Sequence, residues 1–201
     1  PPRPVPEIGW LGVVAIATYV GLVIANWRIA VLICLSFLSF GVLGFWQDSL
    51  DLLIVTFISV AIVIVLGMPL AVLVGTSARA NRVITVVLDL MQTMPTFVYL
   101  LPVVLFFGIG VSAAVVSTMV YALPPLVRIA GFGIREVPAT TIEATDSAGQ
   151  TYWQRLFKVQ LPMARKTIIV GLNQTTLAAL SMATLAAFVN GPGLGKPVLA
   201  G

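Results

Sequence analysis

Long apolar runs alternate with short polar intervals along this chain. Each run is close to or within the ~17 to 25 residues with which a helix spans a bilayer. The six runs are residues 10–26, 29–46, 52–75, 83–110, 111–134 and 167–189. This pattern predicts about six membrane-spanning helices. The first two are expected to form a tight hairpin, because only Trp27 and Arg28 separate them.

The fourth run, residues 83–110, is irregular. Asp89 interrupts its apolar sequence, and Pro95 and Pro102 each remove a backbone donor from a helix. Irregular backbone at membrane depth is tolerated only where it is buried in protein or lines a water-filled cavity. We therefore expect a discontinuity near Pro95, with residues 91–99 facing the interior of the bundle.

The longest polar interval of the chain precedes the last apolar run and carries the signals of two short helices. Thr140 with Glu143, and Thr151 with Gln154, have the spacing of a capping box, in which each side chain bonds the backbone of the other residue. Gly149 lies between the two signals, where it is suited to end the first helix and turn the chain.

The second of these short helices has a mostly apolar face, which Pro162 is expected to end. The face is formed by Trp153, Leu156, Phe157 and Gln160. Spacing alone leaves two interpretations open. The interval is either a docking surface for another protein or a connector whose apolar stripe lies on the membrane surface.

The polar interval resembles the EAA loop of ATP-binding-cassette (ABC) importer permeases, whose pattern is E-A-A, three residues, G, nine residues, I-x-L-P. The matching positions are Glu143, Ala144, Gly149, Val159, Leu161 and Pro162, with Thr145 in place of the third small residue and Val159 in place of isoleucine. Residues 91–110, 122–128, 158–164 and 171–182 resemble the glycine betaine/proline permeases in particular. The resemblance covers roughly residues 55–201.

This resemblance implies an all-α membrane protein with the helical bundle of a type I ABC importer permease and a cytoplasmic coupling loop at residues 136–166. It implies a non-catalytic subunit without a cofactor, because two cytoplasmic ATP-binding subunits would hold ATP and Mg²⁺. A second permease copy, an external substrate-binding protein and the lipid bilayer are the other implied partners. The residues implied to couple to the ATPase are Glu143, Ala144, Gly149, Trp153, Leu161 and Pro162.

Two parts are expected along the chain. Residues 1–51 hold an extended, proline-rich lead over residues 1–9, followed by the helical hairpin, and residues 52–201 hold the permease core. In the permeases that the chain resembles, another spanning helix follows the turn at residues 191–195, so the C-terminal end is expected to be incomplete. Within the core, prolines predict a kink at residues 67–69 and a break at Pro124 and Pro125.

The composition excludes several functional classes. Of 201 residues, 59% are hydrophobic and 9% are charged, whereas about 25% are charged in a soluble domain. The chain is therefore an integral membrane protein, and no nucleic acid is expected as a partner despite the net charge of +4. Cys34 is the single cysteine and histidine is absent, which excludes a disulfide framework and imidazole chemistry at a metal or nucleophile. The segment 191–196 fails as a Walker A motif because Asn190 and Pro197 occupy two required positions.

The distribution of lysine and arginine predicts the orientation. With the loop around Glu143 in the cytoplasm, nine basic residues lie inside or at the inner interface, and Arg3 and Lys196 lie outside. The nine are Arg28, Arg79, Arg82, Arg128, Arg135, Arg155, Lys158, Arg165 and Lys166. This asymmetry predicts a multi-pass protein with the N-terminal end outside. The resemblance to ABC importer permeases implies that the membrane is a bacterial or archaeal cell (inner) membrane.

Polar or soft side chains within the apolar helices are candidates for lining a solute pathway. They are Asp89, Gln92, Met94, Tyr99, Asn173, Gln174 and Ser181. The alternative for each is that it joins helices by hydrogen bonds, and for the last helix that it forms a static seam between two permease copies. Asp89 needs a partner or water at membrane depth, and a basic residue at the inner interface is the structural alternative.

With the resemblance, these features predict the transmembrane subunit of an ATP-driven importer. Its substrate is predicted to be a quaternary-ammonium or betaine-type osmolyte delivered by the external binding protein. Such cations are commonly held by aromatic cages, and none is evident in this sequence, so recognition is expected in the binding protein. The alternatives are a permease for another small solute such as an amino acid, and an ATP-independent channel or carrier.

Overall fold

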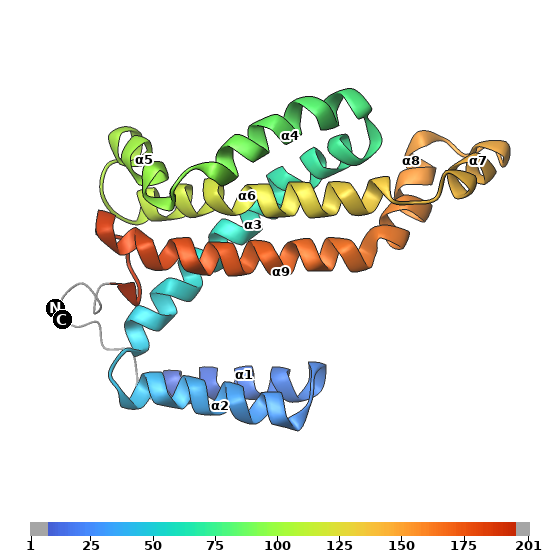
Figure 1. The fold of residues 1–201 in the computed structure, drawn as a ribbon. Helices are drawn as coiled ribbons and strands as arrows, with labels where there is room; N and C mark the ends of the chain where they lie inside the picture. Colours follow the sequence, from blue (N-terminus) through green and yellow to red (C-terminus); the bar gives the residue numbers. More distant parts are fainter. Residues whose placement is uncertain (1–7, 196–201) are drawn as a thin grey trace. The chain divides into compact units, whose positions relative to one another are not determined.

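The computed structural model describes residues 8–195, and its regular structure in that range is entirely helical (Figure 1). The described residues form two compact units that divide between Asp51 and Leu52. The elements are α1 (Ile8–Ile24), α2 (Trp27–Val42), α3 (Trp46–Thr76), α4 (Ala78–Thr93), η1 (Thr96–Tyr99), α5 (Leu100–Phe107), α6 (Val111–Arg135), α7 (Ala139–Ser147), α8 (Tyr152–Arg155), η2 (Leu156–Gln160), α9 (Leu161–Leu185) and η3 (Ala186–Val189).

The first unit contains the hairpin of α1 and α2. Trp27 begins α2, so Ala25 and Asn26 make the connection in place of the predicted Trp27 and Arg28. A Cβ added to Gly21 would lie 2.6 Å from the end of the Ile33 side chain, so the small residue allows the close approach of the two helices. Most of the extended lead predicted at residues 1–9 lies outside the described residues.

The second unit is built around α6, which α3 and α9 approach closely through small residues. A Cβ at Gly131 would lie 2.7 Å from Val74 of α3, and a Cβ at Gly133 would lie 2.6 Å from Thr167 of α9. Glycine at these positions lets the backbones pack at short range, as is common between membrane helices. Figure 1 shows α6 and α9 side by side along most of their lengths.

The break predicted at Pro124 and Pro125 is wrong, because α6 continues through both prolines. Proline is tolerated inside membrane helices where neighbouring helices compensate for the lost backbone bond, and Pro124 is buried. The helix α3 likewise continues through Pro69 to Thr76. Pro102 lies in the first turn of α5, where its missing N–H would have had no partner within that helix.

The discontinuity predicted near Pro95 is confirmed. The helix α4 ends at Thr93, and the following helical segment, Thr96–Phe107, is bent by 110° relative to it. The prediction that residues 91–99 face the interior holds only in part. Tyr99 is buried, whereas the side chain of Met94 is 42% exposed in this chain.

Among the described residues, three helices are long and apolar enough to cross a membrane, and the bent pair adds a fourth if it counts as one span. The three are Trp46–Thr76, Val111–Arg135 and Tyr152–Val189. The hairpin helices have 17 and 16 residues, at the lower limit of a span. Their crossing of the bilayer, and with it the count of six, stays a prediction.

The helix end predicted at Pro162 is wrong. This proline was expected to end the short amphipathic helix, but the chain is helical without interruption over Tyr152–Val189. The segment Leu156–Gln160 is a π-helix, and the Leu161 N–H donates to the Leu156 carbonyl five residues earlier. This wider turn displaces the carbonyls with which the Pro162 ring would clash in a regular α-helix.

Candidate coupling loop and solute pathway

The turn at Gly149 has the geometry of a Schellman motif. The Gly149 N–H donates to the Asp146 carbonyl at 3.0 Å, and the Gln150 N–H donates to the Thr145 carbonyl at 3.1 Å. Gly149 has a φ of 70°, in the left-handed region that favours glycine. The predicted end of α7 and the turn after it are therefore present, and they are built from backbone bonds alone.

Of the two predicted helix caps, one is present and the other is wrong. Thr151 and Gln154 form the complete capping box at the start of α8, with both reciprocal bonds made. Thr140 caps nothing, because α7 already begins at Ala139 after Pro138 and Thr140 lies inside its first turn. Pro138 is the N-cap residue of α7, and no side-chain cap bond is made there.

An ion pair and an aromatic contact brace the two short helices of the loop. The Arg155 guanidinium of α8 pairs with the Asp146 carboxylate of α7 and also lies over the ring of Tyr152, 5.9 Å from its centroid. The Tyr152 hydroxyl donates to the Thr76 hydroxyl at the end of α3, at 3.3 Å. These contacts connect α7, α8 and α3 into one structure.

Glu143 and Ala144 lie exposed on α7, as a docking surface requires. Glu143 also borders a polar cleft of about 370 Å³ between the loop and the ends of α3 and α6, to which Arg135, Arg155 and Gln160 contribute. The Arg135 guanidinium donates to the Val74 carbonyl in the last turn of α3. It thus satisfies a carbonyl near the helix C-terminus, where a cation is favourable.

The apolar face predicted on the second short helix divides into a buried half and an exposed half. Leu156 is 1% exposed and Gln160 is also buried, so both pack inward. Trp153 and Phe157 are 63% and 61% exposed, and their rings stack with centroids 5.9 Å apart. Leu161 joins this stacked pair in lining an apolar groove of about 530 Å³ against α3, while Pro162 is exposed.

The carboxylate of Asp89 pairs with the guanidinium of Arg128, which links α4 to α6. Both side chains are partly exposed, at 55% and 41%. The expectation of a basic partner therefore holds.

The polar residues predicted on the last helix lie on an exposed face of α9. Asn173, Gln174 and Ser181 are all exposed in this chain, and the Ser181 hydroxyl donates to the Leu177 carbonyl at 3.0 Å. The exposed positions repeat at helical spacing along the helix: Met163, Lys166, Val170, Gln174, Leu177, Ser181, Thr184 and Phe188. One continuous face of α9 is thus uncovered by the described residues of unit 2.

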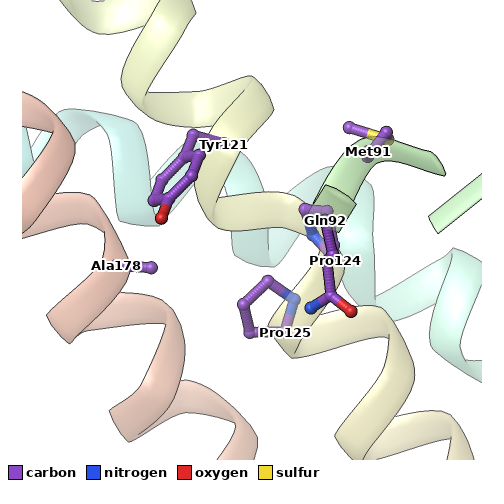
Figure 2. Close-up of a pocket in the computed structure, with 6 residues that line it drawn as sticks. All are labelled: Met91, Gln92, Tyr121, Pro124, Pro125 and Ala178. Atoms are coloured by element: carbon purple, nitrogen blue, oxygen red, sulfur yellow. The ribbon is translucent and has the colours of Figure 1, made fainter. Parts of the chain in front are cut away.

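A cavity of about 180 Å³ lies where α4, α6 and α9 meet (Figure 2). Its lining residues are Met91, Gln92, Tyr121, Pro124, Pro125 and Ala178. Gln92 was a predicted pathway residue, but Tyr121 was missed because nothing local in the sequence distinguishes it from an ordinary aromatic in an apolar helix. Ala178 has Gln174 one turn before it and Ser181 one turn after it on α9, so the cavity adjoins the exposed polar face.

Tyr99, another predicted pathway residue, does not line this cavity but packs against Tyr121, which does. Its ring contacts the ring of Tyr121 edge to face, with centroids 5.9 Å apart, and its hydroxyl donates to the Met91 carbonyl at the end of α4. Met94 does not line the cavity and is half exposed. The structure therefore brings Gln92 and Tyr99 together around Tyr121 and leaves Met94 outside.

The apolar bundle, the broken fourth helix and the braced loop before the last helix together define a helical membrane permease. The chain belongs to the family described as binding-protein-dependent transport system inner membrane component, which matches residues 63–201.

Curated relatives of this family are similar over most of the chain. It is 48% identical over 170 residues to the glycine betaine transport system permease protein OpuAB of Bacillus subtilis, covering 85% of this chain and 60% of that relative. It is 45% identical over 166 residues to the glycine betaine/proline betaine transport system permease protein ProW of Escherichia coli, covering 83% and 47% respectively. The chain thus spans about half to three fifths of the length of these relatives.

A solved structure has a similar fold. It is a chain of the MetNI methionine ABC transporter, from a structure of inward-facing conformations. The match has a TM-score of 0.67 and 26% sequence identity, over 73% of this chain and 74% of that one. The helical architecture of the second unit is therefore that of an ABC importer permease.

Proposed function

We propose that this chain is the transmembrane subunit of an ATP-driven importer that translocates a betaine-type osmolyte delivered by an external binding protein. The names of the similar permeases support the substrate class. The family description supports the dependence on a binding protein. No catalytic step is assigned to this chain, because ATP hydrolysis belongs to separate ATP-binding subunits.

The main observation in support of this proposal is that the second short helix of the loop, α8, continues directly into the long helix α9. The short helices α7 and α8 are fixed to each other by the Arg155–Asp146 pair, and α8 runs without a break into α9. A displacement of the loop by an ATPase is therefore transmitted directly to α9. A channel or carrier independent of ATP has no use for this arrangement.

The assembly that this proposal requires is a pair of permeases with two ATP-binding subunits. The exposed face of α9 carries Gln174, whose amide is costly to leave facing lipid without a partner. A second copy of the permease, with a water-filled path between the two copies, would cover this face and solvate its amide. In this assembly the EAA loop lies on the cytoplasmic side, which the positive-inside distribution of arginine and lysine supports.

The test is reconstitution of the full-length permease with its ATP-binding subunits and binding protein in proteoliposomes. Uptake of labelled glycine betaine, proline betaine and methionine is measured with ATP, without ATP and with a non-hydrolysable analogue inside the vesicles. ATP-dependent uptake of the betaines is expected. Uptake of methionine alone would assign an amino-acid permease instead, and uptake without ATP would assign a channel or carrier.

A further inference from the structure

The cavity beside Tyr121 combines features that suit a cation. Figure 2 shows the Tyr121 ring and the two adjacent prolines of α6 around it, with Ala178 of α9 on one side and Gln92 of α4 on the other. Its volume of about 180 Å³ is below the roughly 300–1,000 Å³ of sites for drug-sized ligands. The space therefore suits a solute of only a few heavy atoms.

The aromatic part of this cavity is held in place. Tyr99 contacts the Tyr121 ring edge to face, and the Tyr99 hydroxyl donates a hydrogen bond to the Met91 carbonyl. Tyr99 is buried and Tyr121 is half-buried at the cavity wall. An aromatic face of this kind attracts a cation within about 6 Å of its centroid, most strongly where water is excluded.

The prolines add negative partial charge at the same place. Pro124 and Pro125 have no N–H, so the carbonyls four residues earlier, those of Val120 and Tyr121, receive no bond from them within α6. Carbonyl groups released from helical bonding are the groups that coordinate cations inside membrane transporters. Two consecutive released carbonyls therefore lie in the turn that carries the Tyr121 ring.

A group suited to an anion lies further along the same face. The helices α4 and α6 run antiparallel here, because Asp89 pairs with Arg128 and, one turn on, Gln92 lines the cavity beside Pro124 and Pro125. The Gln92 amide is a donor at the cavity wall, whereas Arg128 pairs with Asp89 and does not line the cavity. The charge of Arg128 is balanced by Asp89, so the site as a whole does not repel a cation.

We propose that this cavity is a binding site of the permease for a small zwitterion with a quaternary ammonium group. The ammonium lies against the Tyr121 ring and the carbonyls of Val120 and Tyr121, and the carboxylate points to the Gln92 amide. This inference rests on the proposed function. It also changes the expectation from the sequence that recognition sits in the binding protein alone.

The first experiment needs no variant. Binding of isotope-labelled glycine betaine to the purified permease–ATPase complex, without the binding protein, is measured by equilibrium dialysis and by saturation-transfer NMR on the methyl groups. The competitor is 3,3-dimethylbutyrate, which has the same shape but carbon in place of the charged nitrogen. Saturable binding that the isostere displaces at least about tenfold less well than unlabelled glycine betaine is expected, because only the cation interacts with the ring and carbonyls. Absence of binding, or equal displacement by the isostere, would overturn the proposal.

Substitution then assigns the site. Tyr121→Phe keeps the ring and is expected to bind within about twofold of the wild type, whereas Tyr121→Leu is expected to bind about 2- to 30-fold more weakly. The melting temperature and the elution profile of each complex establish that it is folded. If both folded variants bind like the wild type, Tyr121 is not in the site.

The outcome separates this inference from the proposed function. If the wild-type assembly takes up glycine betaine with ATP but its permease–ATPase complex does not bind it, only the cavity assignment fails. If the assembly takes up no betaine at all, the proposed function fails first.

Discussion

Two regions of the second unit, the candidate coupling loop and the exposed face of α9, differ in whether their polar side chains have hydrogen-bond partners within the chain. At the coupling loop, Thr151, Gln154, Arg155 and Asp146 all have partners within the chain. On the candidate pathway face of α9, Asn173 and Gln174 are exposed in an apolar helix, and the described residues provide no hydrogen bond to either amide.

The difference indicates which parts of the molecule are complete by themselves. In the loop, the Arg155–Asp146 pair and the capping box at Thr151 fix the two short helices, so that a displacement can move them as one structure. A surface that must be wet, or must meet a second copy, has polar groups that find partners only in the assembly.

The largest effect is expected at Gly149. Its φ of 70° and the open space around it make the strain of a side chain purely conformational. A left-handed conformation costs a residue with a Cβ about 1–2 kcal/mol, so Gly149→Val should reduce ATP-dependent uptake by about tenfold while ATP hydrolysis continues. Uptake and ATPase rates are measured in the same proteoliposomes.

The matched control at this position is Gly149→Asn. Asparagine visits the left-handed region routinely, so this variant should retain most of the uptake. Normal uptake by the valine variant would show that the turn does not couple the ATPase to transport.

The next effect concerns the pathway face. In a background with Cys34 replaced by alanine, Ser181→Cys should react with a membrane-impermeant thiol reagent at rates that differ several-fold between nucleotide-free and ATP-trapped complexes. Ser181 is exposed, whereas Met182, the next residue, is 0% exposed. Met182→Cys is therefore the control and should stay unreactive in both states. Protection of Cys at position 181 in both states would favour a static seam between two copies.

A smaller effect is expected from the helix cap. Thr151→Ala removes the side-chain acceptor of the Gln154 N–H, which should destabilise α8 by about 1 kcal/mol. Hydrogen exchange at the backbone amides of Tyr152–Arg155 should accelerate accordingly. Thr140→Ala is the control, because Thr140 caps no helix, and its exchange pattern should be unchanged. Equal acceleration in both variants would contradict the assignment of the cap.

The smallest effect is expected from the ion pair of Asp89 and Arg128. Both side chains are partly exposed, so Asp89→Asn should cost less than about 1 kcal/mol and lower the melting temperature by at most a few degrees. The double exchange Asp89→Arg with Arg128→Asp should recover most of the loss. A loss that the exchange leaves unchanged would show that the two charges do not interact.

The features that the sequence predicted are those whose cause is local. The apolar runs predicted the helices, and Gly149 and the Thr151 capping box were predictable because their bonds join residues at most five positions apart. The same rule misplaced the start of α7, because that helix begins at Ala139, directly after Pro138, without a side-chain cap.

What the sequence could not predict depends on packing between distant segments. The continuity of α6 through Pro124 and Pro125 depends on neighbours in α3, α4 and α9. The cavity at Tyr121 joins α4, α6 and α9, and no spacing rule relates them. A basic partner for Asp89 was expected from the sequence, but only the structure identifies it as Arg128, which lies on another helix.

The π-helical turn before α9 has a consequence for how this chain tolerates insertions and deletions. A π-turn holds one residue more than the α-helix that it interrupts, so losing one residue within Leu156–Gln160 would restore a regular helix. That loss would leave the loop close to its present orientation about α9, because the π-turn accommodates the extra residue within one turn. The loss of one residue from the regular part of α9 before Gln174 would instead rotate the loop by about 100° relative to the face that carries Gln174. The wide turn is thus a stretch of this helix where a single deletion preserves the relative direction of the two surfaces.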